Sequence, residues 1–414
     1  MTAEPTSLSG TASVSARDIE QAAEAGAGVI RETPVLSSRT LAERTGMTVA
    51  LKAENLQRTG SFKLRGAMAK LASLGDSCES GVVCGSAGNH AQAVAYAARA
   101  RGVPCEVFMP QGAAISKIEA AIALGAEVRL VGASVDESLA AAHERAREGG
   151  LAFVHPFEDP RVIAGQGGLG LELLRQVPDM ERVVVPVGGG GLISGVAIAI
   201  KSARPEVKVV GVQVEGCAPF LASLSAGEPV AVASALTIAD GIAVKRPGRL
   251  TLSLIEHWVD EMVVVGEDEV AEAMVFLLER AKLVVEGAGA VGVAALLAGR
   301  VAPEADTTVA ILSGGNVDPG LLAQVARRHE SQAGRRLMLL ARVPDRPGSL
   351  AQLLSLVGGL GANLLDVEHI REGLDLHVRE TAVALVLETR GPVHAAEVVG
   401  AVREAGYAEP LAVR

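Results

Sequence analysis

The chain has 414 residues, of which 49% are apolar and only 2% aromatic, and its formal net charge is −10 at pH 7. This negative charge, without blocks of like charge, argues against a nucleic-acid-binding protein, which needs a basic face for the phosphates. The length predicts two or three domains, whose aliphatic core is large enough to need no disulfides.

The four cysteines, at positions 78, 84, 105 and 217, follow no CxxC spacing. This pattern favours buried free thiols in a reducing cytoplasm. The sequence shows neither the pattern of a secretory signal nor a run of about 18 apolar residues. We therefore expect a cytoplasmic protein that does not span a membrane.

Residues 1–15 predict a mobile tail, and Ser15 is expected to cap a helix that begins at Ala16. Up to residue 326, helical stretches then alternate with short apolar runs, at 81–86, 104–109, 127–132, 181–192, 207–215 and 308–316. Such alternation predicts an α/β fold with a parallel sheet covered by helices on both faces. Ligands of such folds bind beyond the carboxyl ends of the strands.

The charged and polar segment 327–336 predicts a linker, after which the pattern changes. Strand-like and helical runs follow in the order βαββαβ, at 337–343, 345–361, 362–372, 381–390, 392–406 and 407–413. This order predicts a ferredoxin-like unit from residue 337 to residue 414.

One lysine stands directly after a tight turn, in the stretch ENLQRTGSFKLRGA at 54–67. Gly60 lets the backbone come close to a ligand, and Phe62 and Lys63 lead into a predicted helix. A solvated surface residue is the ordinary interpretation of such a lysine. A nucleophilic lysine needs a partly unprotonated amine, which burial favours, and three Gly-rich stretches make this second interpretation the stronger one.

Each of these three stretches follows an apolar strand. In GSAGNHAQ (85–92), small residues expose backbone N–H groups at a helix N-terminus, which suits a carboxylate, and Asn89 offers both a donor and an acceptor. The four consecutive glycines at 188–191 predict a cradle of N–H groups around a phosphate. In AILSGGN (310–316), the Ser313 hydroxyl can reach a ring nitrogen. Plain turns are the alternative for all three stretches, although a simple flexible turn would not need four glycines.

Two GxGxxG patterns raise dinucleotide binding as an alternative. The pattern at 165–170 has no strand closely before it. The pattern at 287–292 follows a short apolar run and opens a helix, but a second dinucleotide-binding half is not evident. We interpret 287–292 as a helix N-terminus packed tightly against its neighbours, with NAD binding as the alternative.

The stretches TGSFKLRGA, SAGNHAQ, GGGGL and SGGN stand in the order and spacing of a known family. Over residues 15–325 the chain resembles the fold-type-II pyridoxal-phosphate enzymes, and among them the threonine dehydratase (threonine ammonia-lyase) group. The resemblance implies a tryptophan synthase β-like catalytic domain at 16–326 with two parallel-sheet subdomains, the smaller one inserted at roughly 56–160. The tail from residue 337, which contains DRPGSL, is similar to a regulatory ACT domain.

The resemblance also implies a role for each residue of these stretches. Lys63 binds the cofactor covalently and acts as the base on the substrate, while Phe62 lies against the pyridine ring. Asn89 binds the ring hydroxyl and Ser313 faces the pyridine nitrogen. The cofactor phosphate is held by Gly188, Gly189, Gly190, Gly191 and Leu192. The substrate carboxylate is held by the backbone of Ser86, Ala87, Gly88, Asn89 and His90.

The activity that follows is the dehydration and deamination of L-threonine to 2-oxobutanoate and ammonia, with L-serine, which gives pyruvate, as a further substrate. The alternatives are an L-serine dehydratase, a serine racemase-like enzyme and an NAD-linked oxidoreductase. Serine racemases resemble SSGNH where this chain has Ala87. Because alanine has no proton to give to the opposite face of the substrate, racemisation is disfavoured.

Further expectations concern metals, effectors and partners. No protein-built divalent metal site is expected, because Pro219 and Leu221 stand where further oxygen ligands would be needed beside Glu215. The ACT-like tail implies an amino-acid effector, isoleucine or valine, with isoleucine expected in isoleucine biosynthesis. Enzymes of this kind usually pair through the catalytic domain, so a homodimer or homotetramer is expected. A non-enzymatic sensor is disfavoured because all four cofactor stretches are intact.

Overall fold

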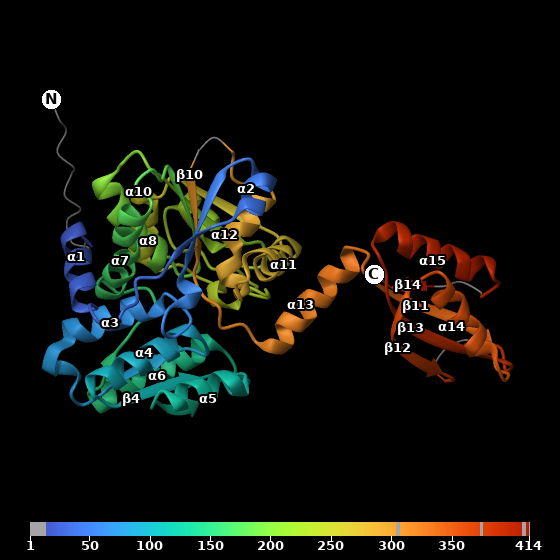
Figure 1. The fold of residues 1–414 in the computed structure, drawn as a ribbon. Helices are drawn as coiled ribbons and strands as arrows, with labels where there is room; N and C mark the ends of the chain where they lie inside the picture. Colours follow the sequence, from blue (N-terminus) through green and yellow to red (C-terminus); the bar gives the residue numbers. More distant parts are fainter. Residues whose placement is uncertain (1–13, 304–306, 373–375, 408–410, 414) are drawn as a thin grey trace. The chain divides into compact units, whose positions relative to one another are not determined.

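The computed structural model describes residues 14–303, 307–372, 376–407 and 411–413 (Figure 1). The chain divides into two compact units, Met1–Asp318 and Pro319–Arg414, and each is described here by itself. Among the described residues, no helix is both long enough and apolar enough to cross a membrane. The four cysteines are free and buried.

The first unit contains two sheets, as the α/β prediction requires. The strands of the larger sheet lie in the order β1 (Val35–Ser37), β2 (Thr48–Ala53), β10 (Thr307–Leu312), β7 (Arg182–Pro186), β8 (Lys208–Val214) and β9 (Glu261–Val265). All neighbouring pairs are parallel except β1 with β2. The smaller sheet is wholly parallel, in the order β5 (Glu127–Leu130), β4 (Cys105–Met109), β3 (Val82–Gly85) and β6 (Ala152–Phe153). Two parallel-sheet subdomains are thereby confirmed.

The central strands of the larger sheet, β7, β8 and β10, are buried on both faces, which explains their largely apolar sequences. On one face, Val183 and Val185 of β7 pack with residues of α7, α8 and α10. On the other face, Val184 and Ala310 lie beside the glycine-rich helix α12. Figure 1 shows these helices on either side of β10. The helices of this subdomain are α1 (Ala16–Ala25), α2 (Arg39–Thr45), α7 (Pro160–Gln176), α8 (Gly191–Ala203), α9 (Pro219–Ala226), α10 (Arg249–Trp258), α11 (Glu267–Phe276) and α12 (Gly287–Leu297).

In the smaller sheet, too, successive side chains of a strand pack against helices on opposite faces. Val82 and Cys84 face a core cluster with helices α3 (Lys63–Leu74), α4 (Asn89–Arg101) and α5 (Ile115–Ala123), whereas Val83 packs with α6 (Val135–Gly149). Short turns complete the first unit: the 3-10 segments η1 (Glu54–Leu56), η2 (Gly75–Cys78) and η3 (Asp240–Ile242), and the π-helical segment η4 (Leu277–Ala281).

The second unit has the predicted βαββαβ order. Its elements are α13 (Pro319–Gln332), β11 (Arg336–Pro344), α14 (Ser349–Gly359), β12 (Asn363–Ile370), β13 (Glu380–Glu388), α15 (Pro392–Glu404) and β14 (Leu411–Val413). The strands form one antiparallel sheet in the order β12-β13-β11-β14. Residues alternate along β11, so that Leu339 and Ala341 are buried in a core with both α14 and α15 while Met338 is exposed.

Several predicted boundaries differ from the structure. The segment 327–336, predicted as a linker, forms the end of α13 and the turn into β11, because Val325 on α13 is buried and the helix continues to Gln332. Most of the predicted tail, residues 1–13, lies outside the described residues. Val14, which was included in that tail, is buried, and Ser15 caps α1 through a reciprocal pair with Asp18. The short strands β1, β2, β6 and β9 were not predicted.

The GxGxxG pattern at 165–170 lies inside α7, where its glycines serve close packing. A Cβ atom at Gly165 would be 2.6 Å from the Arg65 carbonyl oxygen, and one at Gly167 would be 2.8 Å from the Gly195 carbonyl oxygen. Helix α7 can therefore approach both α3 and α8 only because these positions have no side chain.

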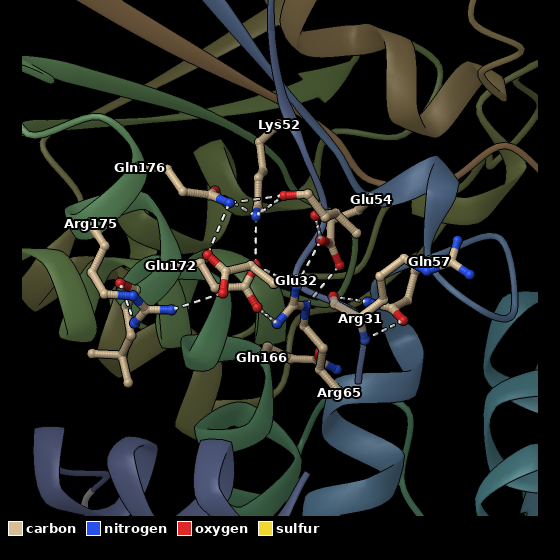
Figure 2. A network of polar contacts seen from close by, with 12 residues as sticks. Arg31, Glu32, Lys52, Glu54, Gln57, Arg65, Gln166, Glu172, Arg175 and Gln176 are labelled. Atoms are coloured by element: carbon tan, nitrogen blue, oxygen red, sulfur yellow. Dashed lines mark hydrogen bonds and ion pairs between the residues drawn. The ribbon is translucent and has the colours of Figure 1, made fainter. Parts of the chain in front are cut away.

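A buried network of charges joins β2, α3 and α7 (Figure 2). The Arg65 guanidinium bonds Glu54 on one side, at 2.8 Å, and Glu172 on the other, at 2.7 Å. The Lys52 ammonium completes the network, 2.5 Å from Glu172. Burial opposes the ionisation of Glu54, but the Arg65 guanidinium and its hydrogen bonds hold the pKa of Glu54 below its ordinary value. The network thus consists of two cations that share two carboxylates.

Replacing one member of this network should be far more damaging than replacing a surface pair. In Glu172→Gln, Lys52 and Arg65 would face a single remaining carboxylate, and we expect the free energy of unfolding to fall by about 3–5 kcal/mol. The control is Glu43→Gln, which removes the partner of Arg39 in an exposed pair and should change that energy by less than about 1 kcal/mol. Urea denaturation measures both, and equal values for the two variants would contradict the prediction.

Candidate functional site

One cavity of about 790 Å³ in the first unit collects the residues singled out in the sequence. It lies where β7 and β10 of the larger sheet and β3 of the smaller sheet end. Its lining includes Phe62, Lys63, Ser86, Ala87, Gly88, Asn89, His90, Gly188, Gly189, Gly190, Gly191, Leu192 and Ser313. Segments far apart in the sequence are thus brought to one place, at the carboxyl ends of parallel strands.

The turn before Lys63 is held by the end of β10. The Phe62 N–H donates to the Ser313 carbonyl oxygen at 3.0 Å, and the Gly315 N–H donates to the Gly60 carbonyl oxygen at 2.9 Å. Gly60 has a φ of 72°, and a Cβ atom there would collide with the Asn316 amide. Helix α3 begins at Lys63 itself, so the loop after β10 fixes where the lysine enters the cavity.

The Lys63 amine is partly buried at the wall of the cavity. Its Nζ donates to the Pro156 carbonyl oxygen at 3.0 Å and lies 5.2 Å from the centre of the Phe62 ring. Burial lowers the pKa of Lys63 to about 8, although the carboxyl group of Glu286 opposes this shift. A substantial fraction of the amine is therefore neutral near physiological pH, as a nucleophile or a base requires.

The four glycines form the turn between β7 and α8. Gly190 has a φ of 89° and immediately precedes α8, so the backbone N–H groups of the first turn of α8 are free of the usual intrahelical partners. A Cβ atom at Gly189 would overlap the Phe157 ring, and one at Gly188 would lie 2.9 Å from Ile242 Cα. The glycines are required by close packing on one side, and they leave the N–H groups accessible to an anion on the other.

Asn89 and Ser313 are fixed by neighbours at the same end of the cavity. The Asn89 Nδ2 donates to Glu286 Oε1 at 2.6 Å, and its Oδ1 accepts from Asn316 Nδ2 at 2.7 Å. The buried Ser313 hydroxyl has one weak bond, at 3.4 Å to the Ala288 carbonyl oxygen. It therefore retains hydrogen-bonding capacity toward the cavity.

The loop before α4 exposes backbone at the start of that helix. Ser86 Oγ accepts from the Gly88 N–H at 3.2 Å, and α4 begins at Asn89. His90 is buried and bonds the Val154 carbonyl oxygen at 2.9 Å, and its burial lowers its pKa to about 3. His90 is thus a structural histidine whose residue also lines the cavity.

The loop VHPF at 154–157 was missed in the sequence, although it touches both halves of the site. The His155 Nδ1 accepts two backbone N–H bonds, from Phe157 at 3.2 Å and from Glu158 at 2.7 Å. The bent loop presents the Pro156 carbonyl to Lys63 and the Phe157 ring to the glycine cradle. Burial lowers the pKa of His155 to about 4, which keeps Nδ1 available as an acceptor at neutral pH.

Two further residues of the cavity, Glu286 and Asn316, were also missed. Glu286 lies directly before α12 and the 287–292 pattern that was interpreted as a packed helix N-terminus, and no strand leads into that helix in the described structure. Its acidic side chain had no partner in the local sequence that could have marked it. Asn316 ends the SGGN stretch, in which only Ser313 was assigned a role from the sequence.

These groups fit pyridoxal phosphate, the cofactor that the resemblance implies. A partly buried amine with a lowered pKa suits an aldehyde, and a helix N-terminus built of glycines suits a phosphate. A buried serine hydroxyl with spare capacity suits a ring nitrogen. The cavity has room for both the cofactor and a small amino acid.

Comparison with known proteins supports the same assignment. The model of a family described as "Pyridoxal-phosphate dependent enzyme" matches residues 27–314. The chain is 47% identical over 395 residues to an L-threonine ammonia-lyase of Thermotoga maritima, covering 95% of this chain and 98% of that protein.

Two solved structures are similar to about three quarters of the chain. A threonine deaminase from T.th. has a TM-score of 0.70 and 40% identity, covering 73% of this chain and 99% of its own. Maize serine racemase has a TM-score of 0.72 and 35% identity, covering 77% of this chain and 98% of its own.

The packing of Gly189 generates a prediction about cofactor binding. In Gly189→Ala, the new methyl group must displace the Phe157 ring, and the cradle must open. We expect the dissociation constant for pyridoxal phosphate, measured by absorbance titration of the apoprotein, to rise at least about tenfold. Gly112→Ala is the matched control, because a Cβ atom there would meet nothing within 4 Å. Unchanged affinity in Gly189→Ala would contradict the proposed cradle.

Proposed function

The chain belongs to the family of pyridoxal-phosphate dependent enzymes, and we infer that it is a threonine ammonia-lyase. It converts L-threonine to 2-oxobutanoate and ammonia, and we propose L-serine, which gives pyruvate, as a second substrate. The observation that carries this function is the meeting of the Lys63 amine, the glycine cradle and Ser313 in one cavity. A relative of that activity matches nearly the whole chain.

The cofactor, when bound, supplies an aldehyde that takes up the substrate amine and a conjugated ring that spreads the negative charge left at the α-carbon. Lys63 is the residue that we propose to hold this cofactor and then to remove the α-proton of the substrate. Its lowered pKa supports the second role, because a base must be neutral at the moment it accepts a proton. Phe62 would limit the movement of the pyridine ring of the bound cofactor.

The remaining residues are proposed to bind and orient. The backbone of Ser86–His90 at the N-terminus of α4 receives the substrate carboxylate, and Gly188–Leu192 receive the phosphate. Asn89 bonds the ring hydroxyl and Ser313 faces the ring nitrogen. A serine hydroxyl is a weaker partner for a charged ring nitrogen than a carboxylate is. Ser313 therefore favours prompt elimination over transamination.

Two alternative functions are less well supported. Ala87 lines the cavity and has no proton to give, so the residue that would set a serine racemase apart is missing despite the similar fold. An NAD-linked oxidoreductase would need a strand leading into Gly287–Gly292. The residues directly before α12 instead pass from a π-helical segment through residues 282–286, which form no strand.

We propose that the second unit is a regulatory ACT-like domain that binds an amino-acid effector. Its βαββαβ order and its DRPGSL turn into α14 support this role. The Thermotoga maritima relative covers 95% of the chain, which includes most of this unit, whereas the threonine deaminase structure covers 73%. We also propose that the protein acts in the cytoplasm as a homodimer or homotetramer.

Replacement of Lys63 tests the activity itself. We expect Lys63→Ala to form 2-oxobutanoate from threonine at least about a thousandfold more slowly, because both the covalent anchor and the base are lost. Lys70→Ala on the same helix is the control, since Lys70 pairs with Asp159 away from the cavity lining and should leave turnover near the native rate. Borohydride reduction of the wild type should leave a pyridoxyl mass on the peptide that contains Lys63. Native turnover in Lys63→Ala would refute the assignment.

Steady-state kinetics of the full chain test the regulatory proposal. We expect millimolar isoleucine or valine to change the apparent affinity for threonine by about fivefold or more, as typical allosteric coupling does. The expected readout is a shift in the threonine saturation curve. Identical curves with and without both amino acids would contradict an effector role for these two.

A further inference from the structure

Glu286 is a buried carboxyl group in the cavity to which the proposed mechanism gives no role. The residue is only 5% exposed and directly precedes α12, with its N–H bonded to the Gly314 carbonyl oxygen at 3.1 Å. Its side chain does not cap its own helix but turns toward Asn89. Burying a carboxylate is costly, and helix capping does not compensate for that cost here. The buried Glu286 side chain therefore indicates another role.

The surroundings of Glu286 are shaped to receive its carboxyl group. Oε1 accepts from Asn89 Nδ2 at 2.6 Å, and the backbone of Asn316 donates a further hydrogen bond to the carboxyl. A Cβ atom at Gly314 would collide with the same oxygen, and one at Gly241 would lie 3.4 Å from it. A side chain at Gly314 would thus displace the carboxyl group, whereas Gly241 lies only at contact distance from it.

Charged groups face Glu286 from three other elements. Lys63 at the start of α3 interacts with it electrostatically, as do Lys117 on α5 and Asp240 on η3. Lys117 and Asp240 are themselves paired at 2.6 Å, so their charges largely offset each other. Burial, with a contribution from Asp240, raises the pKa of Glu286 to about 7, although Asn89, Lys117 and Asn316 oppose the rise.

We propose that Glu286 is a positioning residue, whose carboxyl group orients the Asn89 amide toward the cofactor and whose charge governs the protonation of the Lys63 amine. This inference rests on the proposed function, since it assigns the role of a further residue in the same site. It concerns two separate effects, one through a hydrogen bond and one through charge, and the two can be tested apart.

The orientation of the Asn89 amide follows from its two fixed partners. Asn316 Nδ2 donates both to the Thr59 carbonyl oxygen, at 2.8 Å, and to Asn89 Oδ1, which identifies the oxygen end of the Asn89 amide. An ionised Glu286 can only accept, so it must face the nitrogen end. One N–H of Asn89 Nδ2 then remains for the ring hydroxyl of the cofactor. The series of hydrogen bonds from Thr59 through Asn316 and Asn89 to Glu286 therefore fixes the direction of this remaining N–H group.

The charge effect follows from the place of the two groups, because Lys63 and Glu286 line the same cavity and the Glu286 carboxyl group acts on the Lys63 amine electrostatically. Ionised Glu286 favours the ammonium form of Lys63, whereas neutral Glu286 favours the free amine. A permanently neutral residue at position 286 should therefore make Lys63 lose its proton at a lower pH. The reactivity of the Lys63 amine would then rise at a lower pH than in the native chain.

Two substitutions separate these effects. Glu286→Gln keeps an oxygen acceptor for Asn89 but removes the charge, and Glu286→Ala removes both. Asp136→Asn is the control, because it removes an exposed carboxylate that lines the same cavity. The probe is pyridoxal phosphate added to each full-length apoprotein, with its covalent capture at Lys63 followed by visible absorbance from pH 6 to 10, a range that spans about 8, the pKa of Lys63.

We expect the midpoint of the capture profile to fall by about half a pH unit or more in both Glu286 variants, and to stay at the native value in Asp136→Asn. Cofactor affinity should stay within about threefold in Glu286→Gln and fall about tenfold in Glu286→Ala, where the Asn89 amide loses its partner. A native midpoint in Glu286→Gln would overturn the charge effect. Native affinity in Glu286→Ala would overturn the orienting effect.

The same experiment distinguishes this inference from the proposed function. Capture at Lys63, located by borohydride reduction and peptide mass, is measured without threonine. A wild type that captures the cofactor at Lys63 but forms no 2-oxobutanoate would refute the threonine activity while leaving the two measurements on Glu286 intact. Circular dichroism of the variants at each pH shows that the comparison is made between folded proteins.

Discussion

The buried network of Lys52, Glu54, Arg65 and Glu172 is the constraint on which the catalytic unit depends (Figure 2). Charges removed from water are tolerated only when each has a partner in good geometry, so the network permits one mutual arrangement of β2, α3 and α7. Arg65 lies two residues after Lys63 on the same helix. Because the network fixes the position of α3, it also fixes the position of the Lys63 backbone, from which the side chain extends.

Closely packed helices connect the charge network to the cavity. Helix α7 contacts α3 and α8 at glycine positions, and α8 in turn begins at the glycine cradle. The loop at 154–157 leads from the small sheet toward α7 and places Pro156 against Lys63 and Phe157 against the cradle. The amine and the anion site are thus held by one continuous set of packed elements rather than by separate loops, which suits a reaction that needs both at fixed separation.

Local patterns made part of this architecture predictable. Alternating apolar strands and helices predicted the parallel sheets, and glycine-rich strand ends predicted which residues line the cavity, because both signals lie within about ten residues of sequence. Glu286 and His155 had no such signal, since Asn89 lies 197 residues from Glu286 and burial is not visible in the sequence. The segment 327–336 was misplaced as a linker because a charged solvent-facing helix surface has the composition of a loop.

Burial acts on the two titratable groups of the site in opposite directions. It lowers the pKa of Lys63 to about 8 and raises that of Glu286 to about 7, so each group is drawn toward its neutral form near physiological pH. A cradle made of backbone N–H groups attracts a phosphate without adding a side-chain cation that would depend on pH. The anion site and the amine are consequently controlled by different physics. The first depends on the geometry of the helix N-terminus, and the second on burial together with the charge of Glu286.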